Sequence, residues 1–153
     1  LARLAVSLGK ESGYQVDLLD LRDFKLPFAG EEGSFDVEIV SRLKEKMMSY
    51  KKFVFCVPVY NYDVSASAKN LIELVGDTWL ENTTIGFICA AGGQNSYMSV
   101  MSFANSLMLD FRVWIVPRFV YSVSNDWHEG ELKNGKVNER IEGLLESLIS
   151  GPN

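Results

Sequence analysis

Histidine and cysteine are scarce in this sequence, which limits the chemistry that its side chains can perform. Among 153 residues there is one histidine, His128, and there are two cysteines, Cys56 and Cys89. A metal site requires several ligands at fixed spacing, and a Ser-His-Asp or Cys-His arrangement would have to use this single histidine. The G-x-S-x-G, G-x-G-x-x-G and G-x-x-x-x-G-K-[ST] motifs are also absent. We therefore expect neither a metal site nor a nucleophilic triad.

Long apolar runs and basic clusters are missing as well. No run approaches the ~18 apolar residues of a membrane helix, and no basic segment followed by an apolar one opens the chain. The 15 basic residues are outnumbered by 20 acidic ones, and the only adjacent basic pair is Lys51 and Lys52. A nucleic-acid-binding protein needs a clustered basic face. We therefore expect the protein to bind neither nucleic acid nor membranes.

The rest of the composition is that of an ordinary globular domain. Apolar residues make up 47% of the chain and charged residues 23%, close to the average of soluble domains. At this length folding buries roughly two-thirds of the chain's surface, so we predict one domain over residues 1–153. Cys56 and Cys89 both lie inside apolar runs. This placement favours buried, inert thiols in a reducing compartment, the cytoplasm.

Helix-like and strand-like patterns alternate along the whole chain. The patterns predict helices over residues 1–12, 35–50 (with Ser34 as N-cap), 66–75, 97–110 and 137–149, and strands over 14–21, 53–57, 84–90 and 113–116, with 119–123 extended. The strands over 53–57 and 84–90 are continuously apolar, as strands buried on both faces are. This alternation predicts an α/β protein in which helices cover both faces of a parallel sheet.

Polar and aromatic residues follow the strand at 53–57, where an open parallel sheet binds its ligands. We expect Pro58 to end that strand, because proline lacks an N–H for the ladder. Tyr60 can lie flat against a planar ligand, and Asn61 offers donors and an acceptor to the edge of a heterocycle. The alternative is an ordinary loop between a strand and a helix, with a packed tyrosine.

A second loop, at 91–96, follows the next buried strand and contains Gly92, Gly93 and Gln94. Glycines allow positive φ and let the backbone approach a ligand closely, although paired glycines also form plain turns. In the helix that follows, Met98, Met101 and Met108 recur at helical spacing. They indicate core packing, or alternatively a contact between subunits.

Three segments together resemble the NADPH-dependent FMN reductase family of the flavodoxin-like fold. The first is the P-x-Y-N segment Pro58-Val59-Tyr60-Asn61. The second is the K-N-x-[IL]-[DE] segment Lys69-Asn70-Leu71-Ile72-Glu73, at the spacing that the family uses. The third is the Gly92-Gly93 loop, after which a leucine-rich helix leads to a short strand that ends in Pro117. The resemblance extends from residue 1 to about residue 117.

The resemblance implies a flavodoxin-like three-layer α/β/α sandwich with a parallel sheet of order 2-1-3-4-5. It implies FMN as cofactor and NADPH or NADH as co-substrate, with hydride passing through the flavin to free flavin, a quinone or an azo compound. No catalytic side chain is needed, because the flavin carries the chemistry. The flavin-binding residues implied are Pro58, Tyr60, Asn61, Tyr62, Gly92, Gly93 and Gln94. Around the open face of the ring, the resemblance places Tyr62 and the 117–127 loop with Arg118, Tyr121 and Trp127.

The family resemblance also implies a homodimer or homotetramer with the flavin near a subunit boundary. The methionine-bearing helix at 97–110, or the helix before it, would supply part of the interface. Two other functions fit the same patterns. One is a flavin-binding electron carrier or redox sensor that does not turn over NAD(P)H. The other is a non-flavin α/β domain that binds another nucleotide or a protein partner.

Two features depart from the family pattern. Asp63 stands where the family often has Ser or Thr, and it would place negative charge near a flavin that must accept hydride. The family's phosphate loop precedes a helix that continues with Leu-Ala-Arg, and this chain opens with Leu1-Ala2-Arg3. We therefore expect the first strand and the phosphate loop to lie upstream of Leu1, and we assign no phosphate-binding residue.

Overall fold

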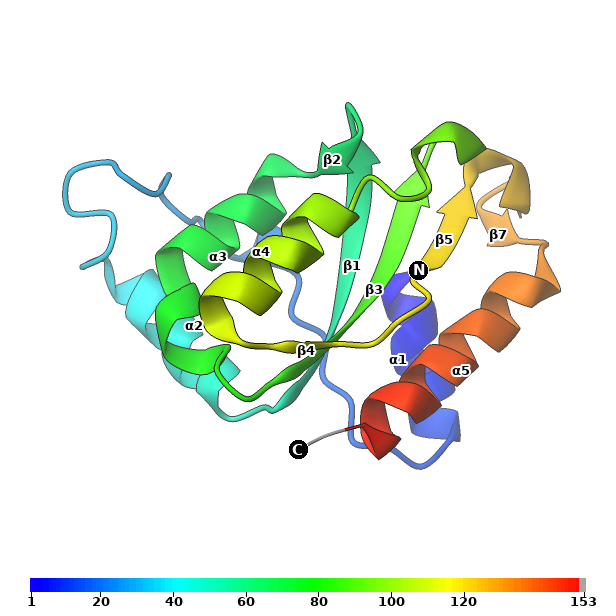
Figure 1. Cartoon of the computed structure of the whole chain (residues 1–153), viewed down its shortest axis with the longest axis horizontal. Coiled ribbons are helices and arrows are strands. Elements are labelled where there is room, and N and C mark those ends of the chain that lie inside the picture. The colour runs from blue at the N-terminus through cyan, green and yellow to red at the C-terminus, as the bar shows by residue number, and fades with distance from the viewer. Residues whose placement is uncertain (152–153) are drawn as a thin grey trace.

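Two helical layers enclose a central sheet in the computed structural model, which describes residues 1–151 apart from the side chains of residues 78 and 79 (Figure 1). One layer consists of α1 (Ala2–Glu11) and α5 (Gly135–Ser150). The other consists of α2 (Glu38–Met48), α3 (Ala66–Trp79) and α4 (Met101–Phe111). This arrangement confirms the predicted α/β fold. No helix in the described part of the chain is long and apolar enough to cross a bilayer.

The two continuously apolar runs form the centre of the sheet. They are β1 (Lys52–Tyr60) and β3 (Thr84–Ala91), which pair in parallel from Lys52 opposite Thr84 to Pro58 opposite Ala90. On its other side β3 pairs in parallel with β4 (Trp114–Ile115) and then with β5 (Val120–Val123). Two short antiparallel pairs complete the strands: β2 (Asp63–Val64) pairs with β1, and β6 (Trp127–His128) pairs with β7 (Glu131–Leu132).

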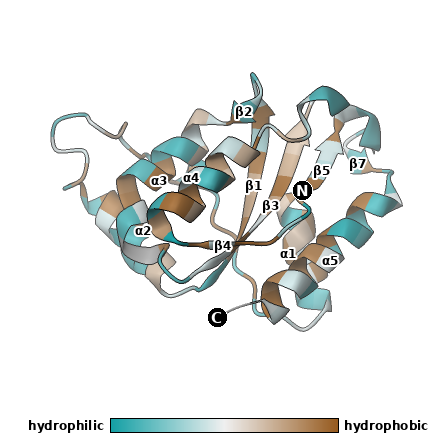
Figure 2. Ribbon diagram, viewed as in Figure 1, coloured by the Kyte–Doolittle hydropathy of each residue, from teal (hydrophilic) through white to brown (hydrophobic). Residues whose placement is uncertain are grey.

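The core is formed where the strands meet the two helical layers, and the central strands β1 and β3 carry the apolar colour in Figure 2. Because successive side chains of a strand point to opposite faces, Phe87 packs toward α2–α4 and Ile88 toward α1 and α5. The Phe87 ring is fully buried and lies against the rings of Phe55, Phe103 and Phe119. Burying each such ring stabilises the fold by about 2–3 kcal/mol.

The segment at residues 14–21, predicted as a strand, is not one. It is extended, but no described strand forms a ladder with it, and Leu21–Asp23 turns into the short 3-10 helix η1. The segment passes from one helical layer to the other. Tyr14 packs against the α1–α5 cluster, whereas Leu19 and Leu21 pack against the opposite one. The alternating pattern does not correspond to one buried face, because Leu18 is 42% exposed, and a strand additionally requires a neighbour for its backbone groups.

Two predicted helices begin later than expected. Ser34 does not cap α2, because residues 28–36 form successive turns, with Gly33 at φ 71°, before the helix starts at Glu38. The Ser34 side chain is buried in these turns. The helix predicted from residue 97 starts at Met101, after the 3-10 helix η2 (Gln94–Ser96) and a further turn.

Candidate functional site

The candidate loops meet at the carboxyl edge of the sheet, at the upper ends of β1 and β3 in Figure 1. Pro58 and Ala90 are register partners, so Tyr60 and Gly92 each lie two residues beyond the same pair. Neighbouring strands are about 4.8 Å apart. Residues 60–63, here called the tyrosine hairpin, and residues 92–97, here called the glycine loop, are therefore neighbours at this edge.

The tyrosine hairpin replaces the loop that the sequence predicted. Pro58 does not end the strand: β1 continues to Tyr60 and turns back into β2, with Tyr60 opposite Asp63. Proline is tolerated there because β2 pairs only with Val59 and Tyr60, so Pro58 has no ladder partner on that side of β1.

The two central residues of this hairpin both have left-handed backbone conformations, with φ 50° at Asn61 and 63° at Tyr62. Two such residues form the tight turn that matches the twist of a hairpin. Asparagine tolerates the conformation, whereas a bulky residue such as tyrosine rarely adopts it, at a cost of order 1 kcal/mol. The rings of Tyr60 and Tyr62 are 62% and 66% exposed. The hairpin thus presents two aromatic rings and an amide to solvent at the carboxyl edge.

The glycine loop is open on its outer side. Neither Gly92 nor Gly93 has a positive φ, and Gly93 is fully extended at φ −156°. A Cβ atom added to either glycine would meet no atom within 4 Å. Unusual backbone conformation therefore does not explain these glycines, but the space that they leave allows a ligand to approach the backbone. Gln94 follows them as the exposed first residue of η2.

Beneath the glycine loop lies Tyr121, which was expected to border the opening. It is 4% exposed, and its hydroxyl donates to the Gly93 carbonyl at 2.8 Å and shares a 2.7 Å hydrogen bond with Ser96 Oγ. Its ring meets Tyr97 edge-on, with the centroids 5.3 Å apart. Arg118, the second of the three 117–127 residues expected at the opening, lies before the amino end of β5. Neither residue therefore lines the opening.

Trp127 does lie near the edge, and its position is fixed. Its indole N–H donates to Ser122 Oγ at 2.9 Å. The neighbouring Asp126 carboxylate accepts the Asn134 side-chain amide at 2.7 Å and the Val123 N–H at 2.8 Å. These hydrogen bonds hold the pKa of Asp126 below its ordinary value. They tie the short β6–β7 hairpin to the end of β5.

A cavity of about 300 Å³ lies between this tryptophan, the first residues of α1 and the ends of β1 and β3. It is lined by Leu1, Ala2, Cys56, Val57, Pro58, Ile88, Ala90 and Trp127. The first N–H groups of a helix have no partner within the helix and favour anions. The cavity therefore brings the start of α1 and the apolar ends of β1 and β3 together at the edge that carries the tyrosine hairpin and the glycine loop.

The two thiols show no sign of reactivity. Cys56 and Cys89 are both free and pack on opposite faces of the sheet. Burial raises the pKa of Cys56 to about 11 and that of Cys89 to about 12. The thiol form therefore persists at neutral pH, and thiolates are the reactive species. Cys89 is fully buried, as predicted, whereas Cys56 is half-buried and contributes to the cavity wall.

The second family segment serves the structure of the chain. The Asn70 amide accepts the Ala29 N–H at 2.8 Å and donates to the Pro27 carbonyl at 2.9 Å, which fastens the preceding long loop to α3. Lys69 pairs with Glu73 one helical turn further on. The sequence marked these residues by resemblance alone, and only the tertiary contacts show what Asn70 holds.

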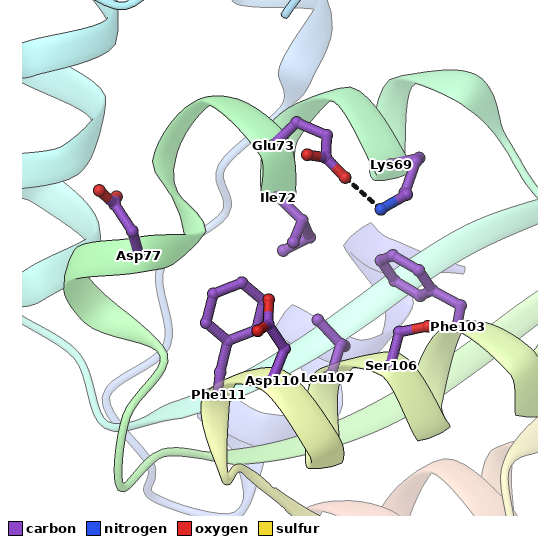
Figure 3. Close-up of a pocket in the computed structure, with 9 residues that line it drawn as sticks. All are labelled: Lys69, Ile72, Glu73, Asp77, Phe103, Ser106, Leu107, Asp110 and Phe111. Carbon is purple, nitrogen blue, oxygen red and sulfur yellow. Dashed lines mark hydrogen bonds and ion pairs between the residues drawn. The ribbon is translucent and has the colours of Figure 1, made fainter.

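A groove of about 240 Å³ runs between α3 and α4, away from all the predicted flavin-binding residues (Figure 3). Its floor is apolar and is formed by Ile72, Phe103, Leu107 and Phe111, and Ser106 also lines it. Its rim carries the Lys69–Glu73 ion pair, Asp77 and Asp110. Three carboxylates and one ammonium group make this rim acidic.

The two helical layers and the parallel sheet define a protein of the flavodoxin-like fold. The model of the NADPH-dependent FMN reductase family matches residues 1–128, and the chain belongs to this family. The protein is accordingly an FMN-dependent oxidoreductase that uses NAD(P)H as co-substrate.

Two relatives share about a quarter of their residues with this chain. An NAD(P)H-dependent FAD/FMN reductase of Geobacillus thermodenitrificans is 25% identical over 88% of this chain and 74% of its own length. An NADPH azoreductase of Bacillus sp. is 23% identical over 89% of this chain and 74% of its own length. The flavoenzyme NAD(P)H:(acceptor) oxidoreductase of Paracoccus denitrificans has the same fold, with a TM-score of 0.74 at 18% identity over 96% of this chain and 84% of that one.

Proposed function

We propose that the flavin ring lies between the tyrosine hairpin and the glycine loop, and that its open face delivers electrons to small planar acceptors, either quinones or azo compounds. The observation that carries this proposal is the pair of exposed tyrosines at the carboxyl edge, one of them held at positive φ. Strained conformations persist where the surrounding structure imposes them, which is often at functional sites. The names of relatives, an azoreductase and an acceptor oxidoreductase, support this class of acceptor.

The chain's own residues bind and orient the reactants. Tyr60 offers a ring face for stacking, the Asn61 amide offers hydrogen bonds to a heterocycle edge, and the open backbone at Gly92 and Gly93 allows close approach. Asp63 keeps its carboxylate at the rim, where it accepts the Val64 N–H at 2.7 Å. When bound, FMN supplies the hydride chemistry, and the protein needs no acid or base of its own.

Titration of the purified protein with FMN, followed by NADPH, tests this proposal. We expect saturable changes in visible absorbance and flavin fluorescence, bleaching on addition of NADPH, and return of the colour with a quinone or an azo dye. Replacing Tyr60 by Ala should weaken binding of the flavin and of the acceptor. Phe28→Ala, at an equally exposed aromatic residue on the distant 24–37 loop, is the control. Binding without bleaching would indicate an electron carrier, and no binding would contradict the assigned site.

We also propose a homodimer formed through the outer surfaces of α3 and α4. Leu109 is 75% exposed on α4, and Met101, Met108 and Trp114 are also exposed on or beside this helix. In a twofold contact each surface meets its own copy, so the exposed apolar side chains of α4 would pack against the same side chains of the partner. Of the methionines predicted at this interface, Met101 and Met108 lie on α4, whereas Met98 precedes the helix.

Sedimentation at micromolar concentration tests the dimer. Leu109→Glu should produce monomers, because it places a charge in the centre of the contact. Ile149→Glu, which alters an exposed apolar residue of α5, should leave the dimer intact. A monomeric wild-type protein would contradict this assembly.

The cytoplasmic location remains a prediction from the two apolar, free thiols.

A further inference from the structure

Tyr121 carries a hydroxyl group that packing in the core does not require. It lies opposite Cys89 in the parallel β3–β5 ladder, with its ring among the apolar residues between the sheet and α4. Phenylalanine would fill that volume equally well. A buried hydroxyl is costly unless it forms hydrogen bonds, and this one forms two, both to the glycine loop above it.

The two bonds act on the loop at the point where it leaves the sheet. Ser96 Oγ, Tyr121 Oη and the Gly93 carbonyl form one chain, with separations of 2.7 and 2.8 Å. In this chain the Ser96 hydroxyl donates to the tyrosine, and the tyrosine donates to the carbonyl. The arrangement closes the loop onto β5 from below and leaves its outer surface free.

The direction of one backbone amide follows from this contact. The peptide unit between Gly93 and Gln94 is planar and trans, so its C=O and N–H point in opposite directions. Because the Gly93 carbonyl accepts the bond from Tyr121, the Gln94 N–H points away from the Tyr121 hydroxyl. In the described part of the chain this N–H has no hydrogen-bond partner.

We infer that Tyr121 is a positioning residue, which holds the glycine loop so that the Gln94 N–H faces the flavin ring. The inference rests on the proposed placement of the ring between the tyrosine hairpin and the glycine loop. A fixed N–H donor stabilises negative charge that develops beside it. The donor at Gln94 thus both strengthens binding of the ring and favours its reduced form.

Tyr121→Phe and Ser96→Ala test the inference, because the first removes both bonds of the hydroxyl chain and the second removes only the bond between Ser96 and Tyr121. We expect the Kd of Tyr121→Phe for both FMN and riboflavin to rise about tenfold, the effect of one well-placed hydrogen bond. The factor should be the same for the two flavins, since the loop contacts the ring and only FMN carries the phosphate. The double variant should bind no more weakly than Tyr121→Phe, because both changes break one chain.

Two further measurements separate positioning from mere stability. The midpoint potential of the bound flavin should become more negative in Tyr121→Phe, and amide exchange in residues 93–96 of the flavin-free protein should accelerate. Tyr50→Phe, which removes another hydroxyl bond far from the edge, to Asp17, should change none of these quantities. Unchanged affinity and potential in Tyr121→Phe, with or without a lower melting temperature, would overturn the inference and leave the proposed function intact. Wild-type protein that binds neither flavin would overturn the proposed site and the inference with it.

Discussion

The two ends of β1 are built in opposite ways. At the amino end, the Lys52 ammonium group donates to the carbonyls of Leu148 and Ile149 at 2.9 and 2.8 Å and to that of Gly151 at 3.3 Å. It thereby satisfies backbone acceptors at the end of α5, where the helix dipole favours a cation. At the carboxyl end, the strand turns through Asn61 and Tyr62, whose side chains project into solvent from left-handed conformations.

This difference separates stability from binding along one strand. The amino end makes several polar contacts between elements and has few exposed aromatic groups, whereas the carboxyl end keeps its rings and amides free. The strand itself spans about 26 Å between Lys52 and Tyr60 at the usual rise per residue. Changes at the amino end should therefore affect the free energy of unfolding, and changes at the carboxyl end should affect flavin binding.

The largest effect is expected at the amino end. Lys52→Met should lower the free energy of unfolding by about 2 kcal/mol, because it removes a charged donor from several helix-end carbonyls, and the melting temperature by about 4–8 °C. FMN affinity should stay the same. Lys51→Met is the matched control, since the neighbouring lysine is exposed and forms no side-chain bond in the described structure. A weakened flavin complex in Lys52→Met would show that the two ends are coupled.

At the carboxyl end, Asn61→Gly should raise the Kd for FMN about tenfold, the effect of one lost hydrogen bond. Its free energy of unfolding should change little, because glycine accepts the φ of 50° at this position. Alanine would be a poorer choice, because it would strain the turn and mix the two effects.

Asn82→Gly is the control for this change. Asn82 has nearly the same conformation, with φ 61°, but it precedes β3 at the amino edge. Both variants should therefore alter folding equally, and only Asn61→Gly should weaken the flavin complex. Equal FMN affinity in the two variants would assign Asn61 to the turn alone.

The sequence predicted the central strands, whose residue pattern depends on burial. Continuous apolar runs identify β1 and β3, because a strand covered on both faces has apolar residues at every position. The same patterns could not supply partners. Residues 14–21 alternate like a strand but have no neighbouring strand among the described residues. Similarly, a proline ends a strand only where the ladder needs an N–H, and β1 has no ladder partner on that side at Pro58.

The candidate site was predictable as an edge of the sheet, but not in its detail. The motif residues Tyr60, Asn61 and Gly93 mark the edge through the resemblance. The resemblance placed Tyr121 at the border of the open ring face, and only its register with Cys89 places the hydroxyl under Gly93. The positive φ of Tyr62 is equally hidden, because residue type favours the opposite conformation.

That strained tyrosine provides a smaller test of the same separation. Tyr62→Gly should stabilise the fold slightly, by at most about 0.5 kcal/mol, since relief of the left-handed strain exceeds the entropy cost of glycine by a small margin. At the same time kcat/KM for a quinone or azo acceptor should fall, because a ring is lost from the edge. Tyr62→Phe retains both strain and ring and should resemble the wild type. A Tyr62→Gly variant that is less stable than the wild type would show that the left-handed conformation of Tyr62 stores no strain.

The smallest effect is expected at the middle of the central strands, where pH acts through Cys56 and Cys89. Their pKa values, about 11 and about 12, lie above the ordinary value of 9.0, so the unfolded chain loses these protons first. Stability from the thiols is therefore complete below about pH 8 and declines as pH rises through 9, where each thiol has lost about 0.4 kcal/mol.

Urea unfolding at pH 7, 8, 9 and 10 measures this decline. Lysines and tyrosines also titrate in this range, but they do so equally in a Cys56→Ala, Cys89→Ala double variant. The difference between the two pH profiles therefore isolates the thiols, even though the variant is less stable at every pH because of the atoms removed. Parallel profiles would mean that water reaches both thiols in the folded protein, in which case the sheet is open between the rigid end of β1 and its binding end.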